Sequence, residues 1–291
     1  MNEETLLGTF ATLASLWEVQ IGPKPGLVDR FGSGAHDDMD YITFLSSLCA
    51  ISPFWPLQAR VGLDGISPRK AMDRLRPTGL EMERAMTEAT GGVNTHKGLI
   101  FALSLLLFGA GTDLSSTGKV DPRKAAALAA ETVEESVRIQ LASLSRLGPA
   151  AGLTHGEQLF LKHGITGIRG EASTGFPSVL DRGLPALRRA LEAGASLHDA
   201  ALCAFFSIAA VCEDSNVISR GGYAFWKESH LPRMRELSEV CPPYSPGFIR
   251  NLHKLDAEYA SLRVSPGGAA DLLSCALFLY WAQLVNMRPL S

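Results

Sequence analysis

Helical periodicity runs through almost the whole chain of 291 residues, and the alternation typical of strands is hard to find. Residues 3–20 show the spacing of one buried helix face, with apolar side chains at Leu6, Leu7, Phe10, Leu13, Ala14 and Trp17. Asp121 and Pro122 begin a second clear helix that extends to about Leu147. The sequence therefore predicts an all-α protein, with one compact domain over residues 1–291.

Further helices follow from the same periodicity, near residues 39–52, 98–111, 155–163, 184–193, 197–212, 222–239, 247–263 and 267–286. Thr78 and Glu81 have the spacing of a capping box, which predicts a short helix that ends at the glycine pair 91–92. The longest apolar stretches fall short of the roughly 20 residues needed to cross a bilayer. We therefore expect them to be helices surrounded by protein.

The charge balance excludes several classes of partner. The chain has 27 Lys and Arg against 30 Asp and Glu, a net charge of −3, so no general positive field exists to hold nucleic acid or an anionic membrane. An anionic ligand must then be bound by a local cluster of cations. The five cysteines are scattered and form no C-x-x-C spacing, which argues against structural zinc and disulfides and favours a reducing cytoplasm.

Four connections combine glycines with many ionisable side chains, at residues 22–40, 90–98, 164–177 and 213–222. Loops that need only to be soluble do not usually combine flexible backbone with His, Asp, Arg and Lys. We expect the binding and catalytic residues to lie in these four loops.

The first loop carries both signs of charge, with Lys24, Arg30, His36, Asp37, Asp38 and Asp40. If a helix begins at Asp37, then Asp37 and Asp40 share one face and His36 lies beside them. Carboxylate oxygens at that spacing suit Mg²⁺, and Mg²⁺ suits phosphates. The alternative is that Asp38 or Asp40 only caps the next helix.

The second loop, TGGVNTHKG, resembles a phosphate loop but is not one, because His96 stands where a second glycine belongs. We expect Asn94 or Thr95 to cap a long apolar helix, with His96 and Lys97 in its first turn. Free amides, the helix dipole and Lys97 would together bind an anion there. The alternative is an ordinary capped helix with a solvated lysine.

The third loop places Arg169 and Glu171 among four glycines. A later segment, SPGGAADLLS, has the pattern of a helix start in which Ser265 is the cap and Asp271 faces inward. Taken alone, that later segment is a weak indication of a site.

The fourth loop begins with Glu213 and Asp214, directly after an apolar helix, and continues to Asn216 and Arg220. Acids at the carboxyl end of a helix oppose its dipole, so they are held there at some energetic cost. This favours a functional role, and a purely structural ion pair between Asp214 and Arg220 is the alternative.

Five segments together resemble the triphosphoribosyl-dephospho-CoA synthase family, in order and over nearly the whole chain: PKPGLVDRFGSGAHDDMD, GVNTHKGLIFALS, THGEQLFLKHGITGIRGEASTGFP, DSNVISRGG and SPGGAADLL. The resemblance implies an all-helical enzyme that transfers the 5-triphosphoribosyl group of ATP to the 2′-hydroxyl of 3′-dephospho-CoA and releases adenine. The product would be the prosthetic-group precursor for the acyl carrier protein of citrate lyase or malonate decarboxylase. Asp214-Ser215-Asn216 stands where the family has Asp-Thr-Asn, which keeps the hydroxyl.

The implied reaction passes through a state like an oxocarbenium ion, which calls for a carboxylate, an acid and a base. The candidates for these roles are Asp29, Asp40, Glu171 and Asp214, and the sequence does not divide the roles among them. The candidates for binding substrates and phosphates are Lys24, Arg30, His36, Asn94, Thr95, His96, Lys97, His155, Arg169, Asn216 and Arg220. Mg²⁺ would accompany the triphosphate, through Asp37 and Asp40.

Three other readings remain open at this stage. The adjacent His36 and Asp37 suggest a helical Mg²⁺-dependent phosphohydrolase, although suitable further histidines are scarce. A diphosphate lyase or prenyl transferase needs D-D-x-x-D, and this chain has DDMD, one residue short. An inactive nucleotide-binding homologue would have no reason to keep acids in all four loops. We expect no nucleic-acid or membrane partner, and the oligomeric state is not predicted.

Overall fold

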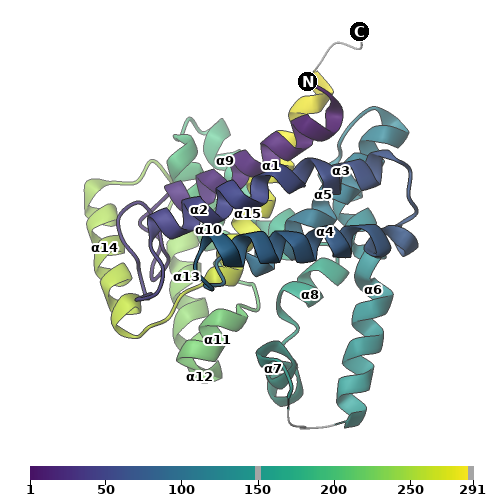
Figure 1. Cartoon of the computed structure of the whole chain (residues 1–291). Coiled ribbons are helices and arrows are strands. Elements are labelled where there is room, and N and C mark those ends of the chain that lie inside the picture. The colour runs from purple at the N-terminus through teal and green to yellow at the C-terminus, as the bar shows by residue number, and fades with distance from the viewer. Residues whose placement is uncertain (148–151, 288–291) are drawn as a thin grey trace.

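The computed structural model describes residues 1–147 and 152–287, and this part of the chain contains helices and no β-strand (Figure 1). The predicted all-α class is confirmed. The α-helices are α1 (Glu3–Gln20), α2 (Tyr41–Ile51), α3 (Trp55–Leu63), α4 (Pro68–Ala89), α5 (Lys97–Thr117), α6 (Pro122–Leu147), α7 (His155–His163), α8 (Gly167–Ser173), α9 (Leu184–Glu192), α10 (Leu197–Ala209), α11 (Ser215–Gly221), α12 (Tyr223–Phe225), α13 (Leu231–Ser238), α14 (Pro246–Ser261) and α15 (Gly267–Ala282). Short 3₁₀ or π turns lie at η1 (Ser52–Phe54), η2 (Val179–Gly183), η3 (Trp226–His230) and η4 (Gln283–Met287).

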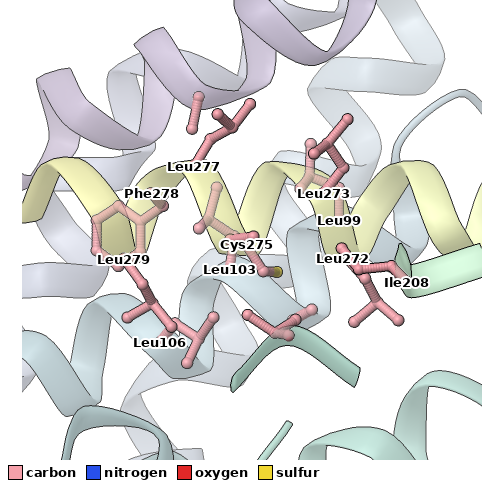
Figure 2. Packing of buried hydrophobic residues seen from close by; sticks show 14 of the residues in the cluster. Leu99, Leu103, Leu106, Ile208, Leu272, Leu273, Cys275, Leu277, Phe278 and Leu279 are labelled. Atoms are coloured by element: carbon pink, nitrogen blue, oxygen red, sulfur yellow. The ribbon is translucent and has the colours of Figure 1, made fainter. Parts of the chain in front are cut away.

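Two apolar helices, α5 and α15, form the centre of the protein. They pack against each other, and α1, α3, α6 and α10 surround them. Figure 2 shows leucines of both helices in one buried cluster, among them Leu99 of α5 and Leu272 of α15. The spans Lys97–Thr117 and Gly267–Asn286 are long and apolar enough to cross a membrane, contrary to the expectation from the sequence. However, 78% and 72% of their most apolar windows are buried inside the protein, as in the core helices of a globular domain.

Glycines allow α5 to approach its neighbours closely. A Cβ atom added at Gly62 of α3 would overlap the carbonyl oxygen of Phe108 in α5. A Cβ atom added at Gly109 of α5 would likewise overlap the carbonyl oxygen of Ala125 in α6. The helices around the centre are therefore in backbone contact at these two points, and no larger side chain fits there.

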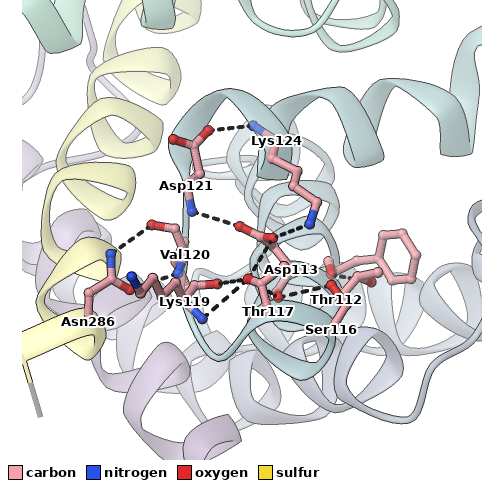
Figure 3. A network of polar contacts seen from close by, with 10 residues as sticks. Thr112, Asp113, Ser116, Thr117, Lys119, Val120, Asp121, Lys124 and Asn286 are labelled. Carbon is pink, nitrogen blue, oxygen red and sulfur yellow. Dashed lines mark hydrogen bonds and ion pairs between the residues drawn. The ribbon is translucent and has the colours of Figure 1, made fainter. Parts of the chain in front are cut away.

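A buried carboxylate fixes the turn between α5 and α6 (Figure 3). Asp113 is 1% exposed and accepts hydrogen bonds from the amide of Asp121 at 2.7 Å and from the hydroxyl of Thr117 at 3.1 Å. Lys124 Nζ lies 2.7 Å from the same carboxylate. The amide of Val120 donates to Asn286, which ties this turn to the segment after α15. The short polar turn is therefore a connection within the helical core.

The prediction of a helix start at Thr78 is wrong. The helix α4 begins at Pro68, runs through Pro77 and ends only at Ala89. A proline inside a helix removes one hydrogen bond, but α4 buries Leu75 and Met82 on either side of it. Packing on both sides therefore holds the helix together across the proline.

Several helices lie where the sequence indicates only loops. The helices α8 and α11 occupy the third and fourth loops with seven residues each, and α3 was not expected at all. The single helix expected at 222–239 is instead α12, a π turn and α13. The predictions at 3–20, 122–147 and 155–163 match the structure at both ends, and the others agree within a few residues, except that α5 continues to Thr117, beyond the predicted 98–111.

Candidate active site

A cavity of about 900 Å³ opens where the connections between helices meet. All four loops that the sequence singled out contribute to its wall, together with the ends of α1, α6 and α7 and the start of α15. The lining includes these predicted site residues: His36, Asn94, Thr95, His96, Lys97, Arg169, Glu171, Asn216 and Arg220. Segments far apart in the sequence thus form one concave site, which is the usual shape of a small-molecule site.

Three cationic side chains from distant segments line this cavity. Lys97 Nζ lies 2.9 Å from a carboxylate oxygen of Glu83, and Arg169 donates to the side chain of Gln140 at 2.9 Å. The contacts of Arg220 within the described structure are longer, at 3.4 to 3.5 Å. All three residues are exposed to solvent, so their charges can meet an incoming anion. They supply the local positive charge that an acidic protein needs to bind phosphates.

The amino terminus of α5 reaches the cavity with a different cap from the one expected. The N-cap is His96, and the side-chain oxygen of Asn94 accepts a hydrogen bond from the amide of Lys97 at 3.2 Å. Thr95 instead donates its hydroxyl to Ser47 at 2.7 Å. The first turn of α5 therefore brings Lys97 and the positive end of the helix dipole to the cavity, a setting that favours anions, although the amide of Lys97 already has Asn94 as its acceptor.

His96 is a buried wall of the cavity rather than an exposed cation. It is 3% exposed, its Nδ1 lies 2.7 Å from the hydroxyl of Ser47, and its ring packs edge-on against Phe44. Burial lowers the pKa of His96 to about 3, so its imidazole is neutral at physiological pH. Its Nε2 is buried without a hydrogen-bond partner in the described structure.

Glu213 and Asp214 are each bound to the start of another helix. Glu213 accepts from the amides of Thr166 and Gly167 at the start of α8, at 2.6 and 3.2 Å. Asp214 is the N-cap of α11, and its second oxygen accepts from the amide of Ala269 in α15 at 2.9 Å. The expected cost of placing these acids at the carboxyl end of the preceding helix is offset, because both stabilise the amino termini of other helices.

Burial nevertheless dominates the ionisation of Asp214. It is 1% exposed, and burial raises its pKa to about 6, although the three backbone amides that it accepts from oppose this effect. Asp214 lies behind the cavity wall, so the carboxyl acts on the site through the helices that it holds. The alternative of an ion pair between Asp214 and Arg220 is not observed in the described structure.

Glu171 is the one predicted catalytic carboxyl that lines the cavity directly. Its two oxygens accept from the amide of Ser178 at 2.7 Å and from the hydroxyl of Ser178 at 3.0 Å. Burial raises the pKa of Glu171 above its ordinary value. The side chain is therefore fixed in place, and its pKa lies closer to neutral pH than the pKa of an exposed glutamate.

Among the other carboxyls of the wall are Glu18 and Asp271, and of these two only Asp271 drew attention in the sequence. Glu18 continues the buried face of α1 after Leu7, Ala11 and Ala14, and it is 5% exposed. A charged residue at a core position of an amphipathic helix is the signal that sequence reasoning missed.

Lys24 is the buried partner of Glu18. It was expected to bind phosphate, but it is not among the residues that line the cavity. Its Nζ lies 3.0 Å from Glu18 Oε1 and also donates to the backbone carbonyls of Glu18 and Ile21, and the whole residue is 0% exposed. The side chain expected to bind phosphate is therefore enclosed, and its charge is already paired with Glu18.

Asp29 and Arg30 also lie outside the described lining of the cavity. Asp29 is 3% exposed and accepts from the amides of Lys24 and Phe31 at 3.0 and 2.7 Å, so its carboxylate shapes the first loop. Arg30 stacks over the ring of Phe31, 4.6 Å from its centroid. Both residues therefore stabilise the local structure of the first loop and do not contact the cavity.

The expected magnesium site at Asp37 and Asp40 is not formed by the described structure. The helix α2 begins at Tyr41 and not at Asp37, so the two carboxylates do not share a helix face. Asp40 caps α2 in a capping box with Thr43, as the alternative reading held, and Asp37 pairs with Arg263 at 2.6 Å. Within residues 1–147 and 152–287, no group of three or more His, Cys, Asp or Glu is arranged to hold a metal ion.

Two other histidines, His36 and His155, are predicted to bind substrate. His36 lines the cavity, with Nδ1 at 3.7 Å from Asp38 and 3.5 Å from Arg220, and burial is the main cause that lowers its pKa. His155 is the first residue of α7, but its side chain lies outside the described part of the structure.

Comparison with known proteins identifies the family to which this site belongs. A family model described as ATP:dephospho-CoA triphosphoribosyl transferase matches residues 4–288. A protein of Streptococcus mutans serotype c is 36% identical over 96% of this chain and 97% of its own length, and one of Streptococcus equi subsp. zooepidemicus is 37% identical over the same shares. A third, from Streptococcus pyogenes serotype M1, is 36% identical over 97% of this chain and 98% of its own length.

Each of these relatives is named "Probable 2-(5''-triphosphoribosyl)-3'-dephosphocoenzyme-A synthase". No solved structure matches this chain. The family match covers all four glycine-rich loops and every helix that contributes to the cavity. The chain is therefore a transferase that belongs to the ATP:dephospho-CoA triphosphoribosyl transferase family.

Proposed function

We propose that the cavity binds ATP and 3′-dephospho-CoA side by side and joins the triphosphoribosyl group of ATP to the acceptor's 2′-hydroxyl, with release of adenine. The observation that carries this proposal is the meeting of Lys97, Arg169 and Arg220 in one cavity that also holds the half-buried carboxyl of Glu171. Cations bind the phosphates of both substrates, and the carboxyl serves the sugar carbon where the bond is exchanged.

The triphosphate of ATP is placed at the start of α5 in this proposal. The helix dipole at the start of α5 and the charge of Lys97 act in the same direction there, whereas the neutral His96 contributes no charge. Arg169 and Arg220 approach from α8 and α11, so they remain for the phosphates of the second nucleotide. Each substrate then has its own cationic side chain.

Glu171 is the proposed general base for the acceptor hydroxyl. The carboxylate form of Glu171 accepts the proton as the hydroxyl oxygen bonds to the sugar carbon, and Ser178 keeps the carboxylate oriented. A Glu171→Gln variant keeps the hydrogen-bonding shape on one oxygen but cannot take the proton. We expect its kcat to fall by about 100-fold or more, while the Kd of ATP changes little.

Magnesium belongs to the proposal as a companion of the triphosphate. Asp37 and Asp40 do not fit the role of a resident site, because one is paired with Arg263 and the other caps α2. Mg²⁺ often binds through phosphates and waters with few protein ligands, so a protein cage is not required. An Asp40→Asn variant should therefore leave the Kd of Mg²⁺-ATP unchanged, and clear weakening would return Asp40 to the site.

One assay tests the reaction itself. The protein is incubated with Mg²⁺-ATP and dephospho-CoA, and free adenine and the coupled nucleotide are measured by chromatography. Phosphate release without adenine would favour a phosphohydrolase, and ATP binding without product would favour an inactive homologue. Omission of dephospho-CoA is the control, because transfer requires both substrates.

The product is further proposed to serve, in the cytoplasm, as the prosthetic-group precursor of an acyl carrier protein. Citrate lyase and malonate decarboxylase are the two carrier systems that the family resemblance indicates. Purified carrier proteins of both systems, incubated with the product and their own attaching enzymes, would distinguish them. Modification of only one carrier would assign the pathway.

A further inference from the structure

Glu18 and Asp271 form part of the cavity wall where α1, α5 and α15 meet. Asp271 lies on the first turn of α15, half-buried, and its carboxylate lies against Gly98 in the first turn of α5. The fully buried Lys24 holds Glu18 from behind at 3.0 Å. Two carboxyls from helices far apart in the sequence thus meet beside the proposed place of the triphosphate, although neither was a candidate for catalysis.

The two carboxyls differ in what surrounds them. Glu18 has a cation as its direct partner, and Lys24 is committed to it and to two backbone carbonyls. Asp271 has no cationic partner in the described structure, and the charged groups that act on it are Glu18 and Asp214, both acidic. Burial, with these two neighbours, raises the pKa of Asp271 well above its ordinary value. The backbone amide of Leu99 opposes this rise in pKa in part, and the protonated form of Asp271 is favoured relative to that of an exposed aspartate, as a general acid requires.

We propose that Asp271 is a catalytic residue, the general acid that gives a proton to the adenine ring as the bond between C1′ and N9 of ATP breaks. Glu18, which is paired with Lys24, acts on Asp271 through its charge. This inference rests on the proposed function, which it deepens by assigning the acid of the transfer reaction. Departure of a neutral purine requires a proton donor, because the free anion of adenine is a poor leaving group.

The protons and electrons of the step balance within the cavity. The electron pair of the C1′–N9 bond goes to the purine, which takes the proton of Asp271 on a ring nitrogen. The 2′-oxygen of dephospho-CoA bonds to C1′, and its proton goes to the carboxylate of Glu171. After the products leave, the proton passes through solvent from Glu171 to Asp271, so the net transfer is from the acceptor hydroxyl to adenine.

The position of Asp271 relative to Glu171 agrees with this division of roles. Both carboxyls line the cavity, and both act on the buried thiol of Cys275, one turn beyond Asp271 on α15. No hydrogen bond joins the two carboxyls in the described structure. They therefore reach one cavity from two different helices, α8 and α15, as an acid and a base that serve one sugar carbon require.

A donor that needs no protonation provides the decisive test. ATP methylated at N7 carries a positive purine, which leaves as a neutral base without a proton. We expect Asp271→Asn to lower kcat by about 100-fold or more with ATP, but by less than about tenfold with the N7-methylated donor. Equal losses with both donors would overturn the inference, because a structural defect does not depend on the leaving group.

A second variant disturbs Asp271 without changing it. A Cβ atom added at Gly98 would overlap the carboxylate of Asp271, the flexible end of a side chain, so Gly98→Ala should displace that group at little cost to the fold. We expect a loss of kcat that again shrinks with the N7-methylated donor, at an unchanged Tm. Gly79→Ala is the matched control, because a Cβ at Gly79 in α4 meets nothing within 4 Å. Full activity of Gly98→Ala with ATP would contradict the role of Asp271.

The outcomes separate this inference from the proposed function. If the wild-type protein releases no adenine from ATP or from the methylated donor, both the transfer reaction and its acid are rejected. If the wild type is active and Asp271→Asn retains its kcat with ATP, only the assignment of the acid is rejected. Tm measurements on each variant distinguish a loss of fold from a loss of chemistry.

Discussion

Replacement of Lys24 by methionine tests whether this residue serves the fold or binds phosphate directly. Its ammonium group has Glu18 and two backbone carbonyls as partners and no exposed surface. Methionine has a similar length and fills the same space, but it donates no hydrogen bond. The variant therefore leaves the carboxylate of Glu18, which is 5% exposed, without its counter-charge.

The expected loss of unfolding free energy depends on whether the carboxyl of Glu18 stays charged or takes up a proton in the variant. Removing one partner of a buried ion pair typically costs about 3 to 5 kcal/mol of unfolding free energy. The carboxyl can instead take up a proton, and for a glutamate with the ordinary pKa of about 4.3 this costs about 4 kcal/mol at pH 7. Protonation thus limits the loss to about 4 kcal/mol, which corresponds to a decrease in Tm of very roughly 8 °C.

This limit also predicts a dependence on pH. In the variant the folded protein binds one proton more than the unfolded chain at neutral pH, so its stability decreases as the pH rises. The loss relative to wild type should shrink to about 1 kcal/mol near pH 5. Urea unfolding at both pH values, followed by the fluorescence of the four tryptophans, measures these differences.

A double variant, Glu18→Gln with Lys24→Met, is the matched control. It removes both charges and keeps the volume, so it should recover most of the stability that the single variant loses. A single variant with wild-type stability, a loss that does not change between the two pH values, or a double variant as unstable as the single one would each refute the reasoning.

Three further predictions concern the rest of the fold. Asp113→Ala should lower the unfolding free energy by about 2 to 4 kcal/mol, since the amide of Asp121 loses its acceptor, and a fall below about 1 kcal/mol in urea unfolding would contradict this. Gly62→Ala should destabilise by about 2 kcal/mol or more through its overlap with α5, whereas Gly79→Ala should be neutral or slightly stabilising, and equal Tm values for the two would refute the close approach. Burial that raises the pKa of Asp214 to about 6 should remove about 3 kcal/mol of stability as the pH rises from about 4 to about 7, because the folded carboxyl holds its proton longer than the unfolded one. Unfolding at both pH values should show that Asp214→Asn lacks this contribution, and an identical pH dependence in the variant would count against it.

The sequence predicts the long helices well because each has enough turns to show a buried face. It misses α8 and α11, since seven residues give barely two turns and no periodicity to detect. It places a false start at Thr78 because Thr78 and Glu81 have the spacing of a capping box, while the packing of α4 on its neighbours continues the helix through that point. Local signals therefore locate long elements and fail where tertiary contacts decide.

The site is predictable to the same extent and for related reasons. Glycines beside ionisable residues mark the loops that meet at the cavity, and Lys97, Arg169 and Arg220 reach its wall. The sequence does not show which charged side chains face inward. It therefore predicts Lys24 as a phosphate ligand, whereas the structure buries this side chain completely. The sequence analysis does not identify Glu18, because Glu18 lies on a helix and outside every glycine-rich loop.

The consecutive residues Glu213 and Asp214 have a consequence for how this enzyme can vary. Glu213 secures the start of α8, and Asp214 secures the starts of α11 and α15, so two adjacent positions hold three separate helices. A single residue inserted between them would shift one anchor by more than 3 Å along the chain while leaving the other in place. Natural insertions and deletions should therefore avoid this dipeptide and gather at connections such as the turn after α3, where no such shared anchoring occurs in the described structure.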